Sequence, residues 1–224
     1  MSVPKITVVD FGAGNLFSIR SAIECVGGKV EVTGDPEKIA AADRLILPGV
    51  GAFESAMNKL DETGISQAVK DYVETGRQLL GICLGMQLLF DESYEFGRHK
   101  GLGLIAGKVV RFREPAQDGE SFKIPQICWN KVELPHDKEN ADNLWKGTIL
   151  GETAFGSFFY FVHSYRCIPE RRADVLAETY YGRDRFCSVT RRNNISGCQF
   201  HPERSGEAGL KISVSYTHLT LPTN

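Results

Sequence analysis

Hydrophobic positions in the first 82 residues follow two alternating periods. Short, nearly continuous apolar runs predict buried strands at residues 5–10, 30–33, 44–49 and 78–82. Apolar residues at helical spacing predict helices over residues 16–26 and 65–75, and the pair Asp35-Pro36 marks the start of another helix. Buried strands that alternate with helices indicate an α/β fold, with an open, mostly parallel sheet flanked by helices as in flavodoxin-like proteins.

The second half of the chain has a different pattern, in which aromatic and β-branched residues dominate and helical spacing is rare. Strands are predicted at residues 103–112, 124–134, 156–167, 173–181, 185–191 and 195–203. The run from Phe158 to Arg166 carries aromatic residues on both faces, which predicts core on both sides and a buried, hydrogen-bonded His163. We therefore expect a single domain over residues 1–212, with a β-rich second half.

The final segment, residues 213–224 (SVSYTHLTLPTN), does not match the rest of the domain. A helical pattern begins at residues 206–212, but the segment after it carries β-branched residues, no apolar stripe and a proline. We expect this atypical tail to give the closing helix no amphipathic face and to leave an apolar groove uncovered, which would lower the stability of the protein. The segment also resembles a translated sequencing adapter, so a non-native origin is one interpretation.

Composition and charge narrow the range of functions. The net charge of −2, with 24% charged and 42% hydrophobic residues, is typical of a globular protein and does not favour binding to nucleic acid or to an anionic membrane. The sequence shows no signal-peptide pattern and no long apolar run, so a cytoplasmic location is expected. Six cysteines without a C-x-x-C pair and five histidines without an H-x-x-x-H pair predict reduced thiols and no metal or cofactor site.

The most apolar stretch, LLGICLGMQLLF at residues 79–90, contains a candidate nucleophile, Cys83. Gly81 and Gly85 flank it between a predicted strand and an apolar helix expected to run to the end of the stretch, in the cysteine counterpart of the G-x-S-x-G nucleophile elbow. Such a turn strains the backbone and directs free N–H groups of the helix, including that of Leu84, toward the sulfur or an oxyanion. A simple buried cysteine fits the G-x-C-x-G pattern equally well when the pattern stands alone.

His201 and Glu203, in the segment CQFHPE, are candidates for a base and its orienting carboxylate. We expect them at the end of an apolar strand, where residues two positions apart project from the same face. A carboxylate there accepts the imidazole N–H, which selects one tautomer and stabilises the imidazolium. An H-P-E sequence by itself is more typical of a surface turn, but together with Cys83 it completes a candidate Cys-His-Glu triad.

Two glycine loops follow the first and third predicted strands. In LPGVGAF, residues 47–53, Gly49 and Gly51 lie at the sheet edge where Cys83 is expected, so backbone N–H groups there are candidates to bind a substrate carbonyl. An ordinary strand-to-helix loop explains the same pattern. In FGAGN, residues 11–15, Phe17 stands where a dinucleotide-binding fingerprint has its third glycine, so phosphate binding is not expected.

The segments LLGICLGMQLLF, LPGVGAF, YFVHSY and CQFHPERSG together resemble the triad-type (class I) glutamine amidotransferases. DFGAGN, PQICWN and FYFVHSY make the chain most similar to the glutaminase subunits of imidazole glycerol phosphate synthase, over about residues 5–212. The resemblance implies that Cys83 attacks the side-chain amide of the substrate glutamine. It also implies that His201 passes a proton to the leaving ammonia and that Glu203 orients His201.

The same resemblance implies roles for further residues. The implied oxyanion region comprises Val50, Gly51 and Leu84. The implied glutamine-binding residues are Gly49, Gln87, Glu95, Ser164 and Tyr165. The ammonia would pass to a separate (β/α)8-barrel cyclase that makes imidazole glycerol phosphate and aminoimidazole carboxamide ribotide in histidine biosynthesis, so a heterodimer is expected. Asn15, Trp129 and Tyr160 match family positions at that interface.

Gln126 and Cys128 depart from the family, in which histidine and glycine are usual at these positions. Related subunits that serve the amidation of a nucleotide sugar look similar here, so a different ammonia acceptor is the first alternative. A catalytically silent scaffold that binds and regulates a barrel partner is the second. The presence of all three triad residues argues against the scaffold.

Overall fold

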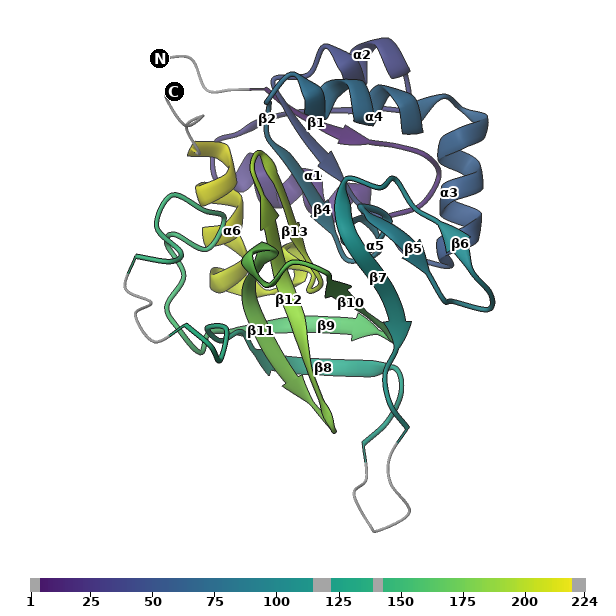
Figure 1. Ribbon diagram of the computed structural model, residues 1–224. Helices are drawn as coiled ribbons and strands as arrows, with labels where there is room; N and C mark the ends of the chain where they lie inside the picture. Colours follow the sequence, from purple (N-terminus) through teal and green to yellow (C-terminus); the bar gives the residue numbers. More distant parts are fainter. Residues whose placement is uncertain (1–4, 115–121, 139–142, 219–224) are drawn as a thin grey trace.

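The computed structural model describes residues 5–114, 122–138 and 143–218, and the first half of the chain forms the predicted parallel sheet (Figure 1). Its strands are β1 (Lys5–Val9), β2 (Lys29–Thr33), β3 (Arg44–Leu47) and β4 (Leu79–Ile82). They lie in the order β2-β1-β3-β4, and β13 (Ile195–Cys198) from the end of the chain pairs with β4 in the same direction. The carboxyl ends of β3, β4 and β13 therefore meet at one edge of the sheet.

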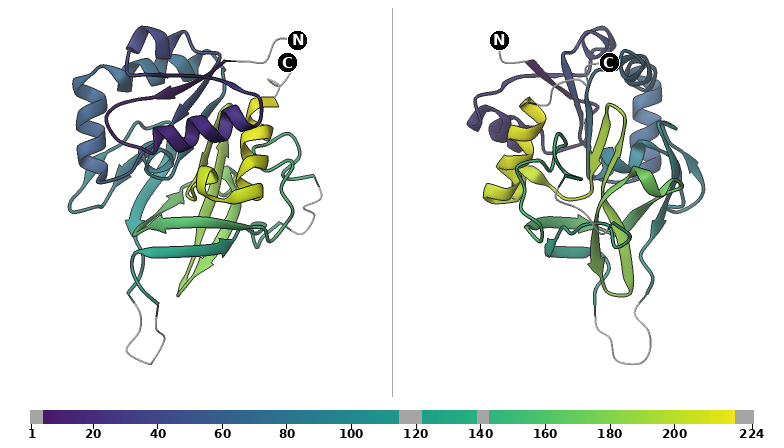
Figure 2. Two further views of the ribbon diagram at one scale, coloured as in Figure 1. Left: turned by 180° about the vertical axis from the view of Figure 1, so that it is seen from behind. Right: turned by 60° about the vertical axis from the view of Figure 1, so that its left-hand side comes forward.

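Helices cover both faces of this sheet because its strands bury side chains on both sides. On one face lie α1 (Leu16–Cys25) and α6 (Gly206–His218), and on the other lie α2 (Pro36–Ala40), α3 (Phe53–Glu62) and α4 (Ile65–Glu74) (Figure 2). In β3, Leu45 and Leu47 pack toward the second group of helices and Ile46 packs toward the first. Asp35 caps α2 by accepting from the Glu37 N–H, as predicted, whereas α3 is not among the predicted helices.

The second half is rich in strands, as predicted, and it extends the sheet in mixed directions. Beyond β13 the order continues with β12 (Asp184–Arg192), β10 (Tyr165–Pro169), β7 (Ile105–Arg111), β5 (Phe90–Ser93) and β6 (His99–Lys100), while β11 (Val175–Tyr181) also pairs with β12. β5 runs parallel to β7, and the other pairs in this half are antiparallel. β8 (Gln126–Lys131) and β9 (Phe158–His163) form a separate antiparallel sheet.

The strand predicted over residues 156–167 is in fact two strands, because the chain changes sheets at Ser164. β9 pairs with β8, whereas β10 pairs with β7 and β12. Phe159 and Phe161 of β9 lie in the core, but Phe158 is 50% exposed. The prediction of core on both sides is therefore wrong, and the outer face of β9 is open to solvent.

The closing helix α6 extends to His218, so the prediction that the helix lacks an amphipathic face beyond residue 212 is wrong. Ile212 and Tyr216 lie one turn apart and are buried in the same cluster as side chains of α1 and the sheet. The Tyr216 hydroxyl lies within hydrogen-bonding distance of the carbonyl oxygens of Leu45 (2.7 Å) and Gln78 (2.8 Å). The rest of the predicted tail, residues 219–224, lies outside the described residues.

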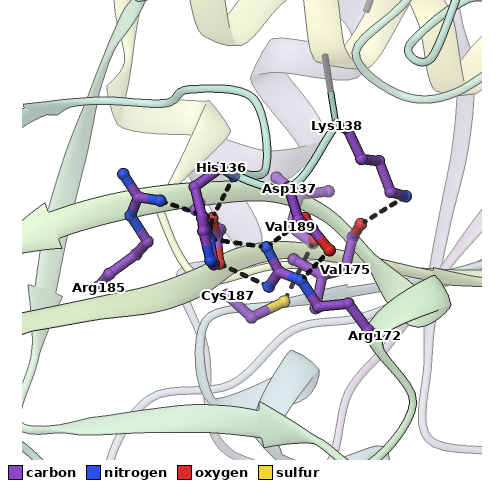
Figure 3. A network of polar contacts seen from close by, with 9 residues as sticks. His136, Asp137, Lys138, Arg172, Val175, Arg185, Cys187 and Val189 are labelled. Carbon is purple, nitrogen blue, oxygen red and sulfur yellow. Dashed lines mark hydrogen bonds and ion pairs between the residues drawn. The ribbon is translucent and has the colours of Figure 1, made fainter. Parts of the chain in front are cut away.

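A buried carboxylate, Glu178 on β11, ties the segment after β8 to the extended sheet. Figure 3 shows the residues His136, Asp137, Arg172 and Arg185 of this network. Arg172 binds both Glu178 (2.6 Å) and Asp137 (2.7 Å), and His136 Nδ1 lies 3.1 Å from Glu178 Oε2. Arg185 approaches the same carboxylate at 3.7 Å. A buried carboxylate is stable here because cationic and hydrogen-bonding groups surround it.

Candidate active site

Cys83 lies at the joint between β4 and α5 (Leu84–Leu88), with a backbone φ of 55° and ψ of −112°. A positive φ is rare for a residue with a side chain, so Cys83 occupies the strained turn that its flanking glycines predict. The Cys83 N–H donates to the carbonyl of Cys198 (2.8 Å), which holds the joint to the end of β13. α5 is shorter than predicted, and Phe90 already begins strand β5.

The two glycines around Cys83 are needed for close packing. A Cβ added to Gly85 would lie 1.8 Å from the carbonyl oxygen of Leu47, and one added to Gly81 would lie 2.8 Å from the backbone of α5. A side chain at either position would therefore push α5 away from β3 and β4. The glycines keep the nucleophile at the carboxyl edge of the sheet.

His201 and Glu203 come from a turn and not from the face of a strand, which corrects the sequence prediction. β13 ends at Cys198, and Pro202–Arg204 form a 3-10 turn directly after His201. The turn places Glu203 Oε1 2.8 Å from His201 Nδ1, with both side chains buried. Because Nδ1–H is bound to Glu203, Nε2 is the ring nitrogen left to exchange a proton with Cys83 or a substrate.

The surroundings of His201 favour its charged form. Burial alone lowers the pKa of His201, but interactions with the Cys83 sulfur and the Glu203 carboxylate outweigh burial and raise this pKa to about 10. Imidazolium is thus the favoured form at neutral pH, and it is the form that can give a proton to a leaving amine. By contrast, burial raises the pKa of Cys187 and of Cys198, so these two cysteines remain thiols.

A pocket of about 300 Å³ at this edge of the sheet brings most of the predicted site residues together. The predicted residues that line it are Cys83, His201, Val50, Gly51, Leu84, Gln87, Glu95, Ser164 and Tyr165. Gly49 packs closely on Leu84, and Glu203 reaches the pocket only through His201. Pro125, Val162 and His163 complete the lining.

The predicted glutamine-binding residues are connected by hydrogen bonds. Gln87 Nε2 donates to Tyr165 O (3.1 Å) and to Gln199 Oε1 (3.1 Å). Both hydrogens of the Gln87 amide are therefore used, so its carbonyl oxygen is the group left to bind a substrate. Glu95 Oε2 accepts from the backbone N–H of Phe53 (2.5 Å), which ties Glu95 to the first residue of α3, just after the glycine loop.

His163, at the end of β9, faces the same pocket, although its sequence context predicts only a core residue. Its Nδ1 lies 2.7 Å from Tyr165 O and carries the proton, because a carbonyl only accepts. Its Nε2 is buried without a partner in the described part of the chain, so the prediction of a hydrogen-bonded histidine holds for one ring nitrogen and is wrong for the other. Burial lowers the pKa of His163 to about 4. The hydrogen bond to Tyr165 opposes this shift, and the charge of His201 adds a smaller lowering effect.

Gln199 is a residue of this site that the motifs do not single out. It is completely buried, and its Nε2 lies 3.8 Å from Cys83 Sγ. The sequence carries a signal for it, since a polar residue interrupts an apolar strand two positions before His201. Residues two positions apart in extended backbone lie on the same side, so Gln199 and His201 are expected to approach the same neighbour.

The three predicted interface residues, Asn15, Trp129 and Tyr160, lie outside the pocket. Trp129 and Tyr160 are opposite each other on β8 and β9, and their ring centroids are 6.2 Å apart. Trp129 is 52% exposed and, with Ile127 and Phe158, forms an exposed apolar surface on the outer face of this sheet, here called the β8–β9 patch. Asn15 directly precedes α1.

Within residues 5–114, 122–138 and 143–218, no group of three or more His, Cys, Asp or Glu side chains is arranged to hold a metal ion. All six cysteines are free. None of the helices in the described part of the chain is long and apolar enough to cross a membrane. The pocket lining offers one thiol (Cys83), two imidazoles (His163 and His201) and one carboxylate (Glu95).

The family of the chain follows from its match to known proteins. The family model for glutamine amidotransferase class-I matches residues 7–212. The chain belongs to the class I glutamine amidotransferases. The chain is 44% identical over 215 residues to imidazole glycerol phosphate synthase subunit HisH 1 of Legionella pneumophila, and the match covers 96% of this chain and 99% of the relative. It is 41% identical over 214 residues to subunit HisH of Wolinella succinogenes, with 96% and 99% covered, so the predicted resemblance is confirmed.

Solved structures of other proteins share this fold at low sequence identity. PurLQS from Thermotoga maritima matches with a TM-score of 0.68 at 19% identity, covering 96% of this chain and 98% of that chain. The crystal structure of another glutamine amidotransferase matches with a TM-score of 0.67 at 19% identity, covering 96% and 99%. These likenesses concern the fold alone, and they confirm the predicted α/β class.

Proposed function

We propose that the chain hydrolyses glutamine to glutamate and ammonia with Cys83, His201 and Glu203, and passes the ammonia to a separate (β/α)8-barrel cyclase of histidine biosynthesis. One observation carries the proposal: a strained cysteine shares a pocket with a histidine whose Nδ1 is bound by a carboxylate at 2.8 Å. The names of the relatives, HisH subunits of imidazole glycerol phosphate synthase, support the pathway. A nucleophilic thiol that must stay reduced fits a cytoplasmic location.

The geometry supports a mechanism with a covalent intermediate. The Cys83 thiolate attacks the side-chain carbonyl carbon of glutamine, and the N–H groups of the Val50-Gly51 loop and of Leu84 are the candidates to bind the oxyanion. When the C–N bond breaks, His201 gives its Nε2 proton to the leaving nitrogen, which departs as ammonia and leaves a glutamyl thioester. Water then attacks the thioester while His201 accepts a proton, which releases glutamate and restores the thiolate and the imidazolium.

We assign the β8–β9 patch to the contact with the cyclase. Exposed aromatic and aliphatic side chains in one patch are typical of protein–protein interfaces. Tyr160, whose ring contacts Trp129 of the patch, is bonded directly to the turn that carries His201. The His201 N–H donates to Tyr160 O (2.9 Å), and Ser205 Oγ accepts from the Tyr160 N–H (3.0 Å) and donates to His201 O (2.6 Å). A partner that displaces Tyr160 would therefore displace His201, which gives a physical reason for glutaminase activity to rise in the complex.

The ammonia acceptor separates this proposal from its alternative, a glutaminase subunit that serves the amidation of a nucleotide sugar. Gln126 and Cys128 are inner-face residues of β8, with Gln126 Nε2 3.6 Å from Cys128 Sγ, so these departures from the family leave the outer patch unchanged. Complementation of a histidine auxotroph that lacks its own glutaminase subunit distinguishes the two pathways. Growth supports the proposal, and absence of growth with an active glutaminase favours the nucleotide-sugar pathway.

A glutaminase assay of the purified chain, alone and with the candidate cyclase and its ligand, tests the proposed chemistry. We expect weak ammonia release from the chain alone, strong release with the liganded cyclase, and none from Cys83→Ala. Ammonia release that persists in Cys83→Ala would refute the role of Cys83. A glutamine-analogue affinity label that fails to react with Cys83 would instead support a catalytically silent scaffold.

A further inference from the structure

The Cys83 sulfur lies near two polar groups with opposite hydrogen-bonding roles. The carbonyl oxygen of Val162, 4.0 Å away, only accepts, so it can bind the proton of the thiol. Gln199 Nε2, 3.8 Å away, only donates, so it favours the thiolate. The charged form of the nucleophile therefore gains a donor that the neutral form does not need.

The orientation of the Gln199 amide follows from its other neighbour. Gln87 Nε2 only donates and lies 3.1 Å from Gln199 Oε1, so the oxygen of Gln199 faces Gln87 and its NH2 group faces the sulfur. Gln87 Nε2 in turn donates to Tyr165 O (3.1 Å). Two linked amides thus connect the backbone of the predicted glutamine site to the nucleophile.

Gln199 is also rigidly placed. Its backbone N–H donates to Ser188 O (2.9 Å), and the residue before it, Cys198, accepts from the Cys83 N–H (2.8 Å). A completely buried amide costs free energy unless its polar atoms are paired, and the side chain of Gln199 is paired with Gln87 and Cys83. The polar atoms of the Gln199 side chain are therefore satisfied by two residues of the pocket and not by the surrounding core.

We propose that Gln199 is a positioning residue for the nucleophile: its side-chain N–H stabilises the Cys83 thiolate, and its carbonyl keeps the Gln87 amide oriented for the substrate. The role in catalysis rests on the proposed glutaminase function, but the effect on the thiol does not require turnover of glutamine. Because an N–H···S⁻ bond stabilises only the charged sulfur, its loss changes the pH dependence of thiol reactivity, which loss of packing alone would not do.

The test compares Gln199→Met with a matched control, Gln126→Met. Gln126 is also completely buried, but its Nε2 faces Cys128 and not Cys83. Alkylation of Cys83 by iodoacetamide is followed by mass spectrometry over about pH 5 to 9 in the full-length chain, with the unfolding midpoint measured in parallel. For Gln199→Met we expect the pH of half-maximal alkylation to rise by about one unit, and for Gln126→Met we expect no change.

Activity in the complex with the cyclase provides the second readout. We expect Gln199→Met to lower kcat for glutamine hydrolysis about tenfold with a smaller change in KM, since one hydrogen bond to a charged group is worth about that factor. Gln199→Glu is a second variant of the same length. Its carboxylate still accepts from Gln87 but cannot donate to the sulfur, so we expect a larger upward shift of the alkylation profile.

An unchanged alkylation profile and an unchanged kcat in both Gln199 variants, with only a lower unfolding midpoint, would overturn the proposal and leave Gln199 as a packing residue. Failure of the glutaminase function gives a different result. In that case the wild-type complex releases no ammonia, while the alkylation profile of Gln199→Met still shifts and the role of Gln199 toward the thiolate stands.

Discussion

Two buried histidines face the same pocket, yet their preferred charge states are opposite. His201 follows β13 and faces Cys83 and Glu203, which raise its pKa to about 10 in spite of burial. His163 ends β9 and has the carbonyl of Tyr165 as its partner, so burial dominates and lowers its pKa to about 4. At neutral pH the first is an imidazolium and the second is a neutral ring.

A place in the pocket does not by itself make a histidine a proton donor. Interactions with the Cys83 sulfur and with the carboxylate of Glu203, two residues after His201, hold the proton on this ring. His163 instead binds Tyr165 O, the same oxygen that accepts from Gln87. A neutral ring can hold this carbonyl without placing a second positive charge beside His201.

Substitution of the two histidines should change the rate of glutamine hydrolysis by very different factors. His201→Asn removes the proposed proton donor to the leaving nitrogen, so we expect kcat for glutamine hydrolysis in the proposed cyclase complex to fall about 10⁴-fold. His163→Asn keeps an N–H that can donate to Tyr165 O, and we expect it to lose less than about tenfold. Similar losses in the two variants would remove the distinction between them.

Glu203→Gln should make the surroundings of His201 more like those of His163. Without the carboxylate, burial has more influence and the pKa of His201 falls, so the imidazolium is lost at lower pH. We expect kcat to fall about 10³-fold and the alkaline limb of the pH–activity profile to move to lower pH. Glu203→Asp retains a carboxylate and should recover part of the activity. A loss that is uniform across pH would argue against this role of Glu203.

For His163, the expected effect is on stability. Because the pKa of His163 is lower in the folded protein than its ordinary value of 6.5, the unfolded chain binds the proton first as the pH falls. Because of this one group, the free energy of unfolding falls by roughly 3 kcal/mol in total as the pH decreases from 6.5 toward 4. His163→Phe does not titrate, so its free energy of unfolding in urea should fall less between about pH 7 and about pH 4.5 than that of the wild type. Equal falls would show that His163 is not held neutral.

The smallest expected effect concerns a buried polar group outside the pocket. The Tyr216 hydroxyl lies against the carbonyls of Leu45 and Gln78, and burial holds its pKa well above the usual value. Tyr216→Phe should lower the free energy of unfolding by about 1 kcal/mol at both pH values, in contrast to the pH-dependent effect at His163. The same measurement tests the end of α6, since no loss at all would mean that the helix is not packed here.

Structural features that depend on residues close together in the chain can be predicted from the sequence pattern. Gly81, Cys83 and Gly85 lie within five residues of each other, so their spacing offers the strained joint as one of two interpretations, and the triad partners His201 and Glu203 favour it. Features that depend on distant contacts do not follow in the same way. Phe90 begins a strand because it pairs with Ile105 of β7, and nothing in the apolar run before it marks that partner.

The closing helix and Gln199 escape prediction for a related reason. The β-branched residues after Ile212 favour helix poorly, but burial of Tyr216 against the sheet overrides that propensity. Gln199 looks like an isolated polar residue in a strand. Its partners Cys83 and Gln87 are 116 and 112 residues away along the chain, so its role is visible only in the folded protein.

The charge states of His201 and His163 can be measured directly by NMR of the protein with ¹⁵N-labelled histidine rings. The variants His201→Asn and His163→Asn assign the signals. At neutral pH we predict that both ring nitrogens of His201 are protonated and that His163 is protonated at Nδ1 alone. A neutral His201 or a charged His163 at that pH would contradict the assignment of His201 as the proton donor of the triad.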